Sequence, residues 1–233
     1  MLAPALHEVR QRLANAALAA RRPAPQLLAV AKAQPATAVA ELAAAGQRAF
    51  GENYVQEAAA KQTQLATLPD LPELEWHLIG HLQSNKARDA AVLFDWVQTL
   101  DRTGLVAALA RHRPADRAPL NVLIQVNIDD ETSKHGCEPG AMTALAQAIA
   151  AEPRLRLRGL MVIPAPHADI EDRRPAFARA RALFEALRGQ HPHADTLSMG
   201  MSDDCAIAIA EGATMVRVGT ALFGARTGKP HHP

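Results

Sequence analysis

The residues of this chain best suited to covalent chemistry lie near its two ends. Lys32 follows a short apolar run, and Arg217, Gly219 and Thr220 belong to a second strand-like run almost two hundred residues later. A lysine amine can form a Schiff base with a carbonyl compound, whereas arginine, threonine and backbone N–H groups bind anions. If the first and last strands are neighbours in a closed barrel, these groups face one pocket.

Arg217 is a charged residue within an otherwise apolar strand. Burial of an unpaired charge is costly, so this arginine must be paired or must face a ligand. Phosphate sites in barrels often lie after strands seven and eight, where glycine lets backbone amides approach the oxygens. Ser198, Gly219 and Thr220 would form such a cradle. A lysine across from it suggests a phosphorylated carbonyl compound held as an imine.

Apolar strand-like runs alternate with helical patterns along the chain. The predicted strands are 27–32, 48–53, 74–80, 96–100, 120–127, 157–163, 196–201 and 215–223. The predicted helices between them are 35–45, 54–66, 84–93, 103–112, 139–151, 171–188 and a last one, capped by Ser202, Asp203 and Asp204, that ends at Glu211. A further helix within 1–22 precedes the first strand.

Regular alternation of strands and helices indicates a parallel sheet. Eight such units in about 225 residues fit an α/β fold, a single (β/α)8 TIM-type barrel with an extra N-terminal helix. The competing fold is an open doubly wound sheet, but the turn at 31–35 lacks the glycines of a dinucleotide-binding turn. We therefore expect one barrel domain at 1–225 and a flexible C-terminal tail at 226–233.

Composition narrows the class of protein. Of 233 residues, 48% are hydrophobic, the net charge is +1, and only 3% are aromatic, which argues against a nucleic-acid or anionic-membrane partner. No apolar run approaches the length of a membrane span. Cys137 and Cys205 have no paired spacing and indicate reduced thiols in a cytoplasmic protein. No heptad or large apolar patch is evident, so a monomer and a weak homodimer both remain open.

Other polar residues at the predicted strand ends have ordinary interpretations. Asn53 would cap the helix that follows it, and Lys134 lies in a polar loop where solvation is the usual outcome. His77 and His81 would be packed, hydrogen-bonded histidines. Because no acidic partner is near them in the sequence pattern, a metal site is the poorer interpretation.

Five segments spread over nearly the whole chain form a specific set. They are Ala-Val-Ala-Lys at 29–32, Gly-Glu-Asn-Tyr at 51–54, Trp-His-Leu-Ile-Gly-His-Leu-Gln-Ser-Asn-Lys at 76–86, Leu-Ser-Met-Gly-Met-Ser-Asp-Asp at 197–204 and Val-Arg-Val-Gly-Thr-Ala-Leu-Phe-Gly at 216–224. In this order they resemble the pyridoxal phosphate homeostasis protein family, which is related to the N-terminal barrel of alanine racemase. The segments 132–136 and 159–161 also look like family segments.

This resemblance implies a site for pyridoxal 5'-phosphate (PLP). Lys32 would hold the cofactor as an internal aldimine, Asn53 would line its pocket, and Ser198, Gly219 and Thr220 would bind its phosphate. Arg217 matches the arginine that approaches the pyridine nitrogen, where a cation disfavours ring protonation and weakens the cofactor as an electron sink. Ala31 and the Gln-Pro pair at 34–35 depart from the family pattern and would alter pocket polarity.

Two function classes follow from the resemblance. The first is a non-enzymatic carrier that buffers PLP or delivers it to PLP-dependent apoenzymes, with no catalytic residue and no metal. The second is an amino-acid racemase, which needs a base on each face of the cofactor, commonly lysine and tyrosine. In racemases that tyrosine comes from an additional β domain, and the single tyrosine here is Tyr54. The carrier is favoured; a Schiff-base aldolase would share the lysine chemistry but lacks the motif match.

Overall fold

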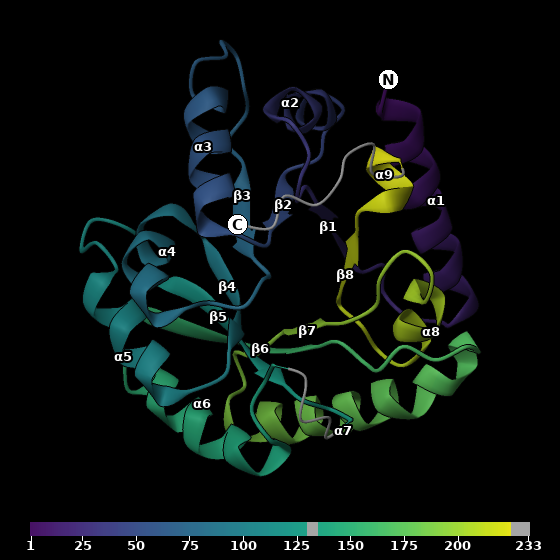
Figure 1. Cartoon of the computed structure of the whole chain (residues 1–233). Helices are drawn as coiled ribbons and strands as arrows, with labels where there is room; N and C mark the ends of the chain where they lie inside the picture. Colours follow the sequence, from purple (N-terminus) through teal and green to yellow (C-terminus); the bar gives the residue numbers. More distant parts are fainter. Residues whose placement is uncertain (130–134, 225–233) are drawn as a thin grey trace.

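The computed structural model describes residues 1–129 and 135–224. In this part of the chain, parallel strands β1 to β8 close into a barrel in sequence order, with β8 paired to β1 (Figure 1). The strands are β1 (Gln26–Val30), β2 (Ala49–Glu52), β3 (Glu75–Leu78), β4 (Trp96–Leu100), β5 (Leu120–Val126), β6 (Leu155–Val162), β7 (Thr196–Ser198) and β8 (Met215–Val218). The predicted (β/α)8 barrel is confirmed. Lys134 and the predicted tail at 226–233 lie outside the described residues.

Helices surround the barrel and alternate with its strands. They are α1 (Ala3–Ala19), α2 (Ala36–Ala44), α3 (Val55–Leu65), α4 (Ala87–Leu93), α5 (Thr103–His112), α6 (Met142–Ala150), α7 (Arg174–Gln190), α8 (Cys205–Ala210) and α9 (Thr220–Phe223), with short 3-10 turns at Ser84–Lys86, Pro139–Ala141 and Ile170–Arg173. The extra N-terminal helix α1 packs beside α8 and α9. Among the described helices, none has the length and apolar content needed to cross a bilayer.

The apolar core lies mainly between the helices and the outer face of the strands. Side chains alternate across each strand, so Val216 and Val218 of β8 join this outer core. Met215 instead packs inside the barrel with Leu28 and Ala49. The helices contribute apolar positions at helical spacing, as Leu105 and Leu109 of α5 show.

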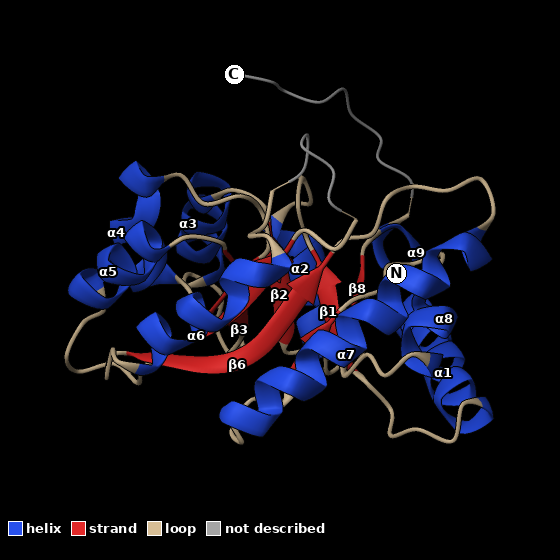
Figure 2. Ribbon diagram, turned by 90° about the horizontal axis from the view of Figure 1, so that it is seen from below, coloured by secondary structure: helices blue, strands red, loops and turns tan. Residues whose placement is uncertain are grey.

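The strands all run in one direction, so their carboxyl ends lie at one mouth of the barrel. In Figure 2 the strand arrows point toward the upper side, which is the side that faces the reader in Figure 1. Ligand sites of such barrels lie at this mouth, because the loops after the strands form it. We refer to it as the carboxyl mouth and to the opposite end as the amino mouth.

The last two strands are shorter than predicted. Strand β8 ends at Val218, and residues 220–223, predicted as strand, form the helical turn α9, in which the N–H groups of Leu222 and Phe223 donate to the Gly219 carbonyl. Alanine and leucine at 221–222 continue the apolar run and hide this change of structure. Strand β7 ends at Ser198, and Gly200 turns the chain with a φ of +89°.

Three smaller predictions at helix and strand ends were also inaccurate. Strand β6 begins at Leu155, before the predicted 157. A 3-10 turn precedes α7, which begins at Arg174 rather than at 171. Asp204 stands at the start of α8 but does not cap it, because its carboxylate accepts hydrogen bonds from the Met201 N–H and from Arg173.

Candidate functional site

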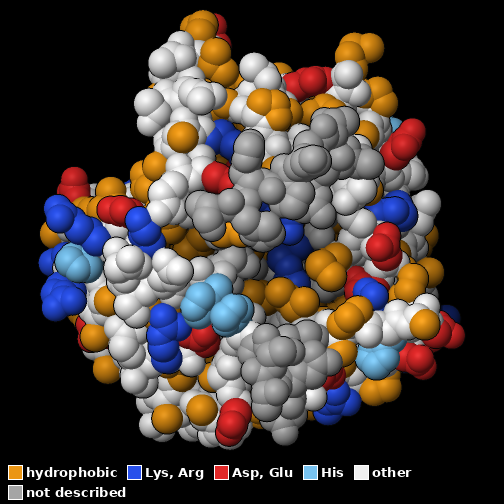
Figure 3. Space-filling model, viewed as in Figure 1, with side chains coloured by type: hydrophobic (Ala, Val, Ile, Leu, Met, Phe, Trp, Pro, Cys, Tyr) orange, Lys and Arg blue, Asp and Glu red, His pale blue; other side chains and the backbone are white. Residues whose placement is uncertain are grey.

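The predicted site residues Lys32, Asn53, Gly219 and Thr220 all follow strands at the carboxyl mouth. Lys32 lies in the turn after β1, Asn53 follows β2, and Gly219 and Thr220 follow β8. Since β1 pairs with both β2 and β8, these three segments are neighbours. Lys32 and Asn53 are half-buried, whereas Thr220 is exposed. Figure 3 shows basic side-chain atoms at the centre of this face, with hydrophobic side chains beside them.

The turn that carries Lys32 is fixed from helix α3. Lys61 of that helix donates a hydrogen bond to the Ala31 carbonyl at 2.7 Å and pairs with the Glu52 carboxylate at the end of β2. Ala33 adopts a left-handed φ of +59°, and the Gln34 N–H closes the turn on the same Ala31 carbonyl. A buried ion pair therefore anchors the backbone next to Lys32.

The Glu52–Lys61 pair is deeply buried, with Glu52 fully inaccessible and Lys61 only 6% exposed. Burial raises the pKa of Glu52, and the neighbouring Lys61 charge partly offsets that rise. The second Glu52 oxygen, Oε2, is buried without a hydrogen-bond partner in the described part of the chain. The carboxylate thus depends on Lys61 for its stabilisation.

Arg217 is the buried cation that its place in an apolar strand predicted. Its guanidinium is 5% exposed and donates through one NH2 group to the Ser198 hydroxyl at 2.8 Å and through the other to the Val162 carbonyl at 2.9 Å. Among the described residues, no carboxylate forms an ion pair with it. Burial lowers the pKa of Arg217 to about 10, so it stays charged at neutral pH.

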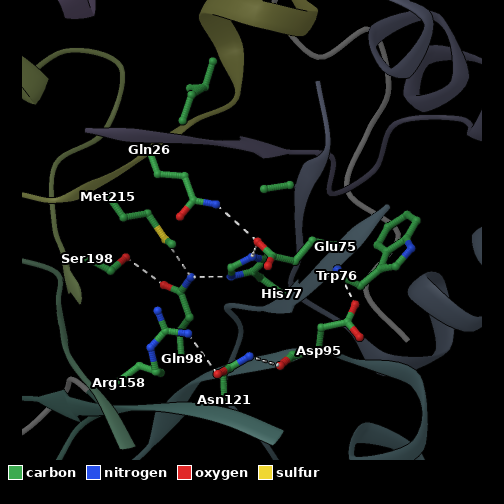
Figure 4. A network of polar contacts seen from close by, with 12 residues as sticks. Gln26, Glu75, Trp76, His77, Asp95, Gln98, Asn121, Arg158, Ser198 and Met215 are labelled. Atoms are coloured by element: carbon green, nitrogen blue, oxygen red, sulfur yellow. Dashed lines mark hydrogen bonds and ion pairs between the residues drawn. The ribbon is translucent and has the colours of Figure 1, made fainter. Parts of the chain in front are cut away.

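Ser198 belongs to a polar network inside the barrel (Figure 4). Its hydroxyl donates to the Gln98 amide oxygen at 2.7 Å, and the Gln98 amide nitrogen lies 2.9 Å from His77 Nδ1. His77 Nε2 lies 2.8 Å from the carboxylate of Glu75, which also accepts from Gln26. Ser198 is fully buried, and its hydroxyl proton is already used within the barrel.

His77 and Glu75 have linked protonation states. Burial lowers the pKa of His77, and this effect outweighs the Glu75 carboxylate, which acts to raise it. The imidazole is therefore neutral at neutral pH. Burial alone would raise the pKa of Glu75, but the hydrogen bonds that its carboxylate accepts, first from His77 and also from Gln26, outweigh burial, and the pKa is lowered. The expectation of packed, hydrogen-bonded histidines holds for His77. The expected lack of acidic partners is wrong, because Glu75 adjoins His77 and Asp101 lies 3.8 Å from His81.

Gly219 and Thr220 begin the helical turn α9. The N–H groups of Thr220 and Ala221 come before the first hydrogen bonds of this turn, which Leu222 and Phe223 donate to the Gly219 carbonyl. A side chain at Gly219 would lie 3.4 Å from the Val30 carbonyl at the end of β1, which shows how near these two strand ends are. Backbone donors and the turn that carries Lys32 therefore share one edge of the mouth.

Other candidate groups have more limited roles. Tyr54 follows Asn53 and is 58% exposed. His81 stacks on His135 with ring centroids 3.8 Å apart, outside the barrel interior. Cys137 and Cys205 are free and buried, and burial raises the pKa of Cys137 to about 11, so neither is disposed to act as a thiolate. Within residues 1–129 and 135–224, no cluster of His, Cys, Asp or Glu is arranged to hold a metal.

The sequence reasoning missed Gln98, Lys61 and Glu52. Gln98 carried the same signal as Arg217, a polar side chain within the apolar strand 96–100, and could have been found by the same argument. Lys61 lies in a helix rich in glutamine and alanine, where a lysine normally reaches solvent. Only the tertiary contact with Glu52 distinguishes it.

Comparisons with known proteins place this chain in one protein family. The profile of the alanine racemase N-terminal domain matches residues 5–227. A Pseudomonas aeruginosa pyridoxal phosphate homeostasis protein is 53% identical over 227 residues, covering 97% of this chain and 96% of the relative. Synechococcus elongatus PipY, solved with PLP bound, is 40% identical, with a TM-score of 0.83 over 96% of this chain and 100% of PipY.

Alanine racemase itself shares the fold but extends beyond it. The Corynebacterium glutamicum enzyme matches 97% of this chain with a TM-score of 0.64 and 21% identity, but only 63% of the enzyme is covered. The likeness at this level of identity concerns the barrel alone. More than a third of the racemase therefore lies outside the region that matches this chain.

Proposed function

Because this chain belongs to the pyridoxal phosphate homeostasis protein family, we propose that it binds PLP at the carboxyl mouth and stores or delivers it without catalytic turnover. Lys32 is the proposed covalent anchor, Asn53 lines the pocket, and Gly219 and Thr220 bind the phosphate. Arg217 is the proposed contact of the pyridine nitrogen. We further propose that the protein is cytoplasmic and that PLP-dependent apoenzymes receive the cofactor.

The observation that carries this proposal is the state of Arg217. A guanidinium that is 95% buried normally has a carboxylate partner, because an uncompensated buried charge is costly. Here its hydrogen bonds go to the neutral oxygens of Ser198 and Val162. A heteroaromatic ligand with an acceptor nitrogen would fit such a donor, because the hydrogen bonds to Ser198 and Val162 already hold the cation in place.

The backbone around Lys32 supports its role as the anchor. The amine nitrogen would form a C=N bond with the aldehyde carbon of the cofactor and release one water. Lys61 and the turn at Ala31 hold the backbone from which Lys32 projects. PLP supplies an aldehyde and an electron-withdrawing ring, and a cation at the ring nitrogen keeps that nitrogen unprotonated, which limits carbanion chemistry.

The phosphate proposal rests on backbone amides more than on Ser198. The N–H groups of Thr220 and Ala221 precede the helical hydrogen bonds of α9, and Thr220 adds an exposed hydroxyl. Ser198 remains a predicted phosphate ligand, but its hydroxyl would have to leave Gln98 in order to donate outward. We therefore weigh Gly219 and Thr220 above Ser198 in the cradle.

The carrier is preferred over the racemase because a second-face base is missing from the described site. Tyr54 is 58% exposed and follows Asn53 at the rim rather than inside the barrel. The racemase fold comparison leaves more than a third of the enzyme unmatched. A water-exposed cofactor suits exchange better than controlled proton transfer at the substrate Cα.

Titration with PLP, followed by an assay for amino-acid turnover, tests this proposal. Binding should produce a visible absorbance band in the wild type that is absent from Lys32→Ala. The loaded protein, incubated with either enantiomer of alanine in deuterium oxide, should exchange the Cα proton no faster than free PLP does. Robust exchange that is lost in both Lys32→Ala and Tyr54→Phe would make the protein a racemase. A wild type that fails to bind PLP would reject the site itself.

A further inference from the structure

We propose that His77, Gln98 and Ser198 are positioning residues that fix the Arg217 guanidinium at the cofactor site through a chain of hydrogen bonds across the barrel interior. This inference deepens the proposed function, because Arg217 is the proposed contact of the pyridine nitrogen. The chain begins at Arg217 near the carboxyl mouth and ends on Glu75 toward the amino mouth. Figure 4 shows its members from Ser198 to Glu75.

The hydrogen bonds of this chain all run in one donor-to-acceptor direction, from Arg217 toward Glu75. Arg217 donates to the Ser198 oxygen, and the Ser198 hydroxyl donates to the Gln98 amide oxygen. The Gln98 amide nitrogen lies 2.9 Å from His77 Nδ1 and, with its other hydrogen, 3.1 Å from the Met215 sulfur. An amide nitrogen can only donate, so Nδ1 must be the unprotonated nitrogen of a neutral imidazole. His77 Nε2 then carries the hydrogen and donates it to Glu75.

The opposite orientation of the Gln98 amide is chemically inconsistent with these neighbours. Its oxygen would face His77 Nδ1, which would then need a hydrogen, and a neutral His77 would turn an unprotonated Nε2 toward the Glu75 carboxylate. Its nitrogen would donate to the Ser198 oxygen, and the Ser198 hydroxyl would lose the Gln98 oxygen as its acceptor. The orientation of the Gln98 amide in the structure allows each of these donors an acceptor, and it links a cation to an anion through neutral groups.

The interior of this barrel contains several buried polar side chains. Barrel interiors are mostly filled by branched apolar side chains, and a buried polar group is costly unless its hydrogen bonds are satisfied. His77, Gln98 and Ser198 are nonetheless all fully inaccessible. Packing does not require these three polar side chains, since apolar residues of similar volume would fill the same space. A role in holding Arg217 accounts for the presence of polar side chains here.

The lower part of the network makes the chain rigid. His77 stacks on Trp96 with ring centroids 5.1 Å apart. The Arg158 guanidinium lies over the Trp96 ring, 4.5 Å from its centroid. Arg158 is itself held by Asp195 and Asn121. The stack sets the plane of the imidazole, and the contacts of its two nitrogens with Glu75 and Gln98 set its orientation within that plane.

Loss of Gln98 should release Arg217 without removing it. Ser198 would lose the acceptor of its hydroxyl proton, so that hydroxyl would rotate and become a poorer acceptor for the guanidinium. Arg217 would keep its bond to the Val162 carbonyl and would lose its fixed orientation. The ring-nitrogen contact should therefore weaken, while the phosphate and aldehyde contacts persist.

The test compares PLP with its analogue in which C–H replaces the pyridine nitrogen, since the two share the aldehyde and the phosphate. Wild type should prefer PLP by about ten-fold or more, which corresponds to one hydrogen bond from a charged donor. In Gln98→Met the preference should fall to about three-fold or less on the same scale. Met161→Leu, a volume-conserving change inside the same barrel, should keep the wild-type preference.

Two further variants and a cofactor-free measurement complete the design. Gln98→Glu retains an acceptor for Ser198 and should restore the preference, with both His77 nitrogens protonated between two carboxylates. Ser198→Ala breaks the row of hydrogen bonds between Gln98 and Arg217 and should lower the preference for PLP in the same way. It replaces Gln98→Met as the test if Gln98→Met does not fold. Nitrogen-15 NMR of the cofactor-free wild type should show His77 neutral, with its hydrogen on Nε2.

Wild-type preference retained in both Gln98→Met and Ser198→Ala would overturn the proposal, as would a His77 hydrogen on Nδ1. Equal wild-type affinity for the two compounds would also overturn it, because Arg217 would then not contact the ring nitrogen. Failure of the wild type to bind either compound would instead reject the proposed function. The NMR result would still decide whether the chain runs in the direction stated.

Discussion

Replacing Lys61 by methionine should destabilise the protein strongly, because it leaves the Glu52 carboxylate buried without its cation. Glu52 is fully inaccessible, and its Oε2 oxygen has no hydrogen-bond partner in the described chain. Removing one member of a buried ion pair typically costs about 3–5 kcal/mol. For a domain with a total stability of about 5–15 kcal/mol, that is a large fraction.

Urea unfolding of the cofactor-free protein, followed by tryptophan fluorescence, measures this loss. With a slope of about 3 kcal/mol per molar urea, the midpoint of Lys61→Met should fall by roughly 1–1.7 M. The double variant Glu52→Gln/Lys61→Met should recover more than half of the loss, since no buried charge remains. Lys86→Met, at a half-buried lysine without an ion pair among the described residues, should stay within about 0.5 kcal/mol of wild type.

The pH dependence of Lys61→Met separates lost charge from lost packing. Burial raises the pKa of Glu52, and removal of Lys61 should raise it further. For a carboxyl group with a raised folded pKa, the penalty of the buried charge is absent below the unfolded pKa. It grows as pH rises from the unfolded to the folded pKa and is complete above the folded pKa. The difference from wild type should therefore shrink between pH 8 and pH 5. A loss no larger than that of Lys86→Met, or one independent of pH, would refute this reasoning.

Four further outcomes are expected. Lys32→Ala should keep the fold by circular dichroism but lose covalent capture of PLP, because the change removes a polar tip rather than core volume. Thr220→Val should weaken PLP retention by about 1–3 kcal/mol in equilibrium dialysis, and pyridoxal without the phosphate should bind equally to variant and wild type. The free energy of unfolding should fall as pH drops below about 6.5, because burial lowers the pKa of His77 and the unfolded chain then binds more protons; His77→Gln should flatten that slope in urea titrations. Lys61→Met should also slow PLP capture in stopped-flow absorbance, since the turn beside Lys32 loses its anchor at Ala31.

The fold could be predicted from the sequence because strand and helix patterns alternate with regular turn signals. The error at residues 220–223 has a simple cause. Apolar residues continue past Gly219, and four residues are too few for a helical period to be distinguished from a strand. The two-residue shift at the end of β1 mattered more for the site, because it places Lys32 in a turn rather than on a strand.

Only some features of the candidate site can be inferred from the sequence. Arg217 was identifiable because a charge within an apolar strand needs a physical explanation, and the structure places it in the barrel interior. The partners of Arg217 were not identifiable, because Ser198 and Gln98 are one hundred residues apart and only barrel closure joins them. The ion pair of Glu52 and Lys61 was not identifiable either, because it forms only when helix α3 packs over the end of β2.

The most direct test of the central claim is borohydride reduction of the PLP-loaded protein, followed by peptide mapping with mass spectrometry. Reduction fixes the C=N bond, so the pyridoxyl group should be found on Lys32, in stoichiometric amount and with no comparable label on Lys61 or Lys86. The yellow absorbance should disappear in step with labelling. Label on another lysine with Lys32 unmodified, or no label at all, would contradict the account of this site.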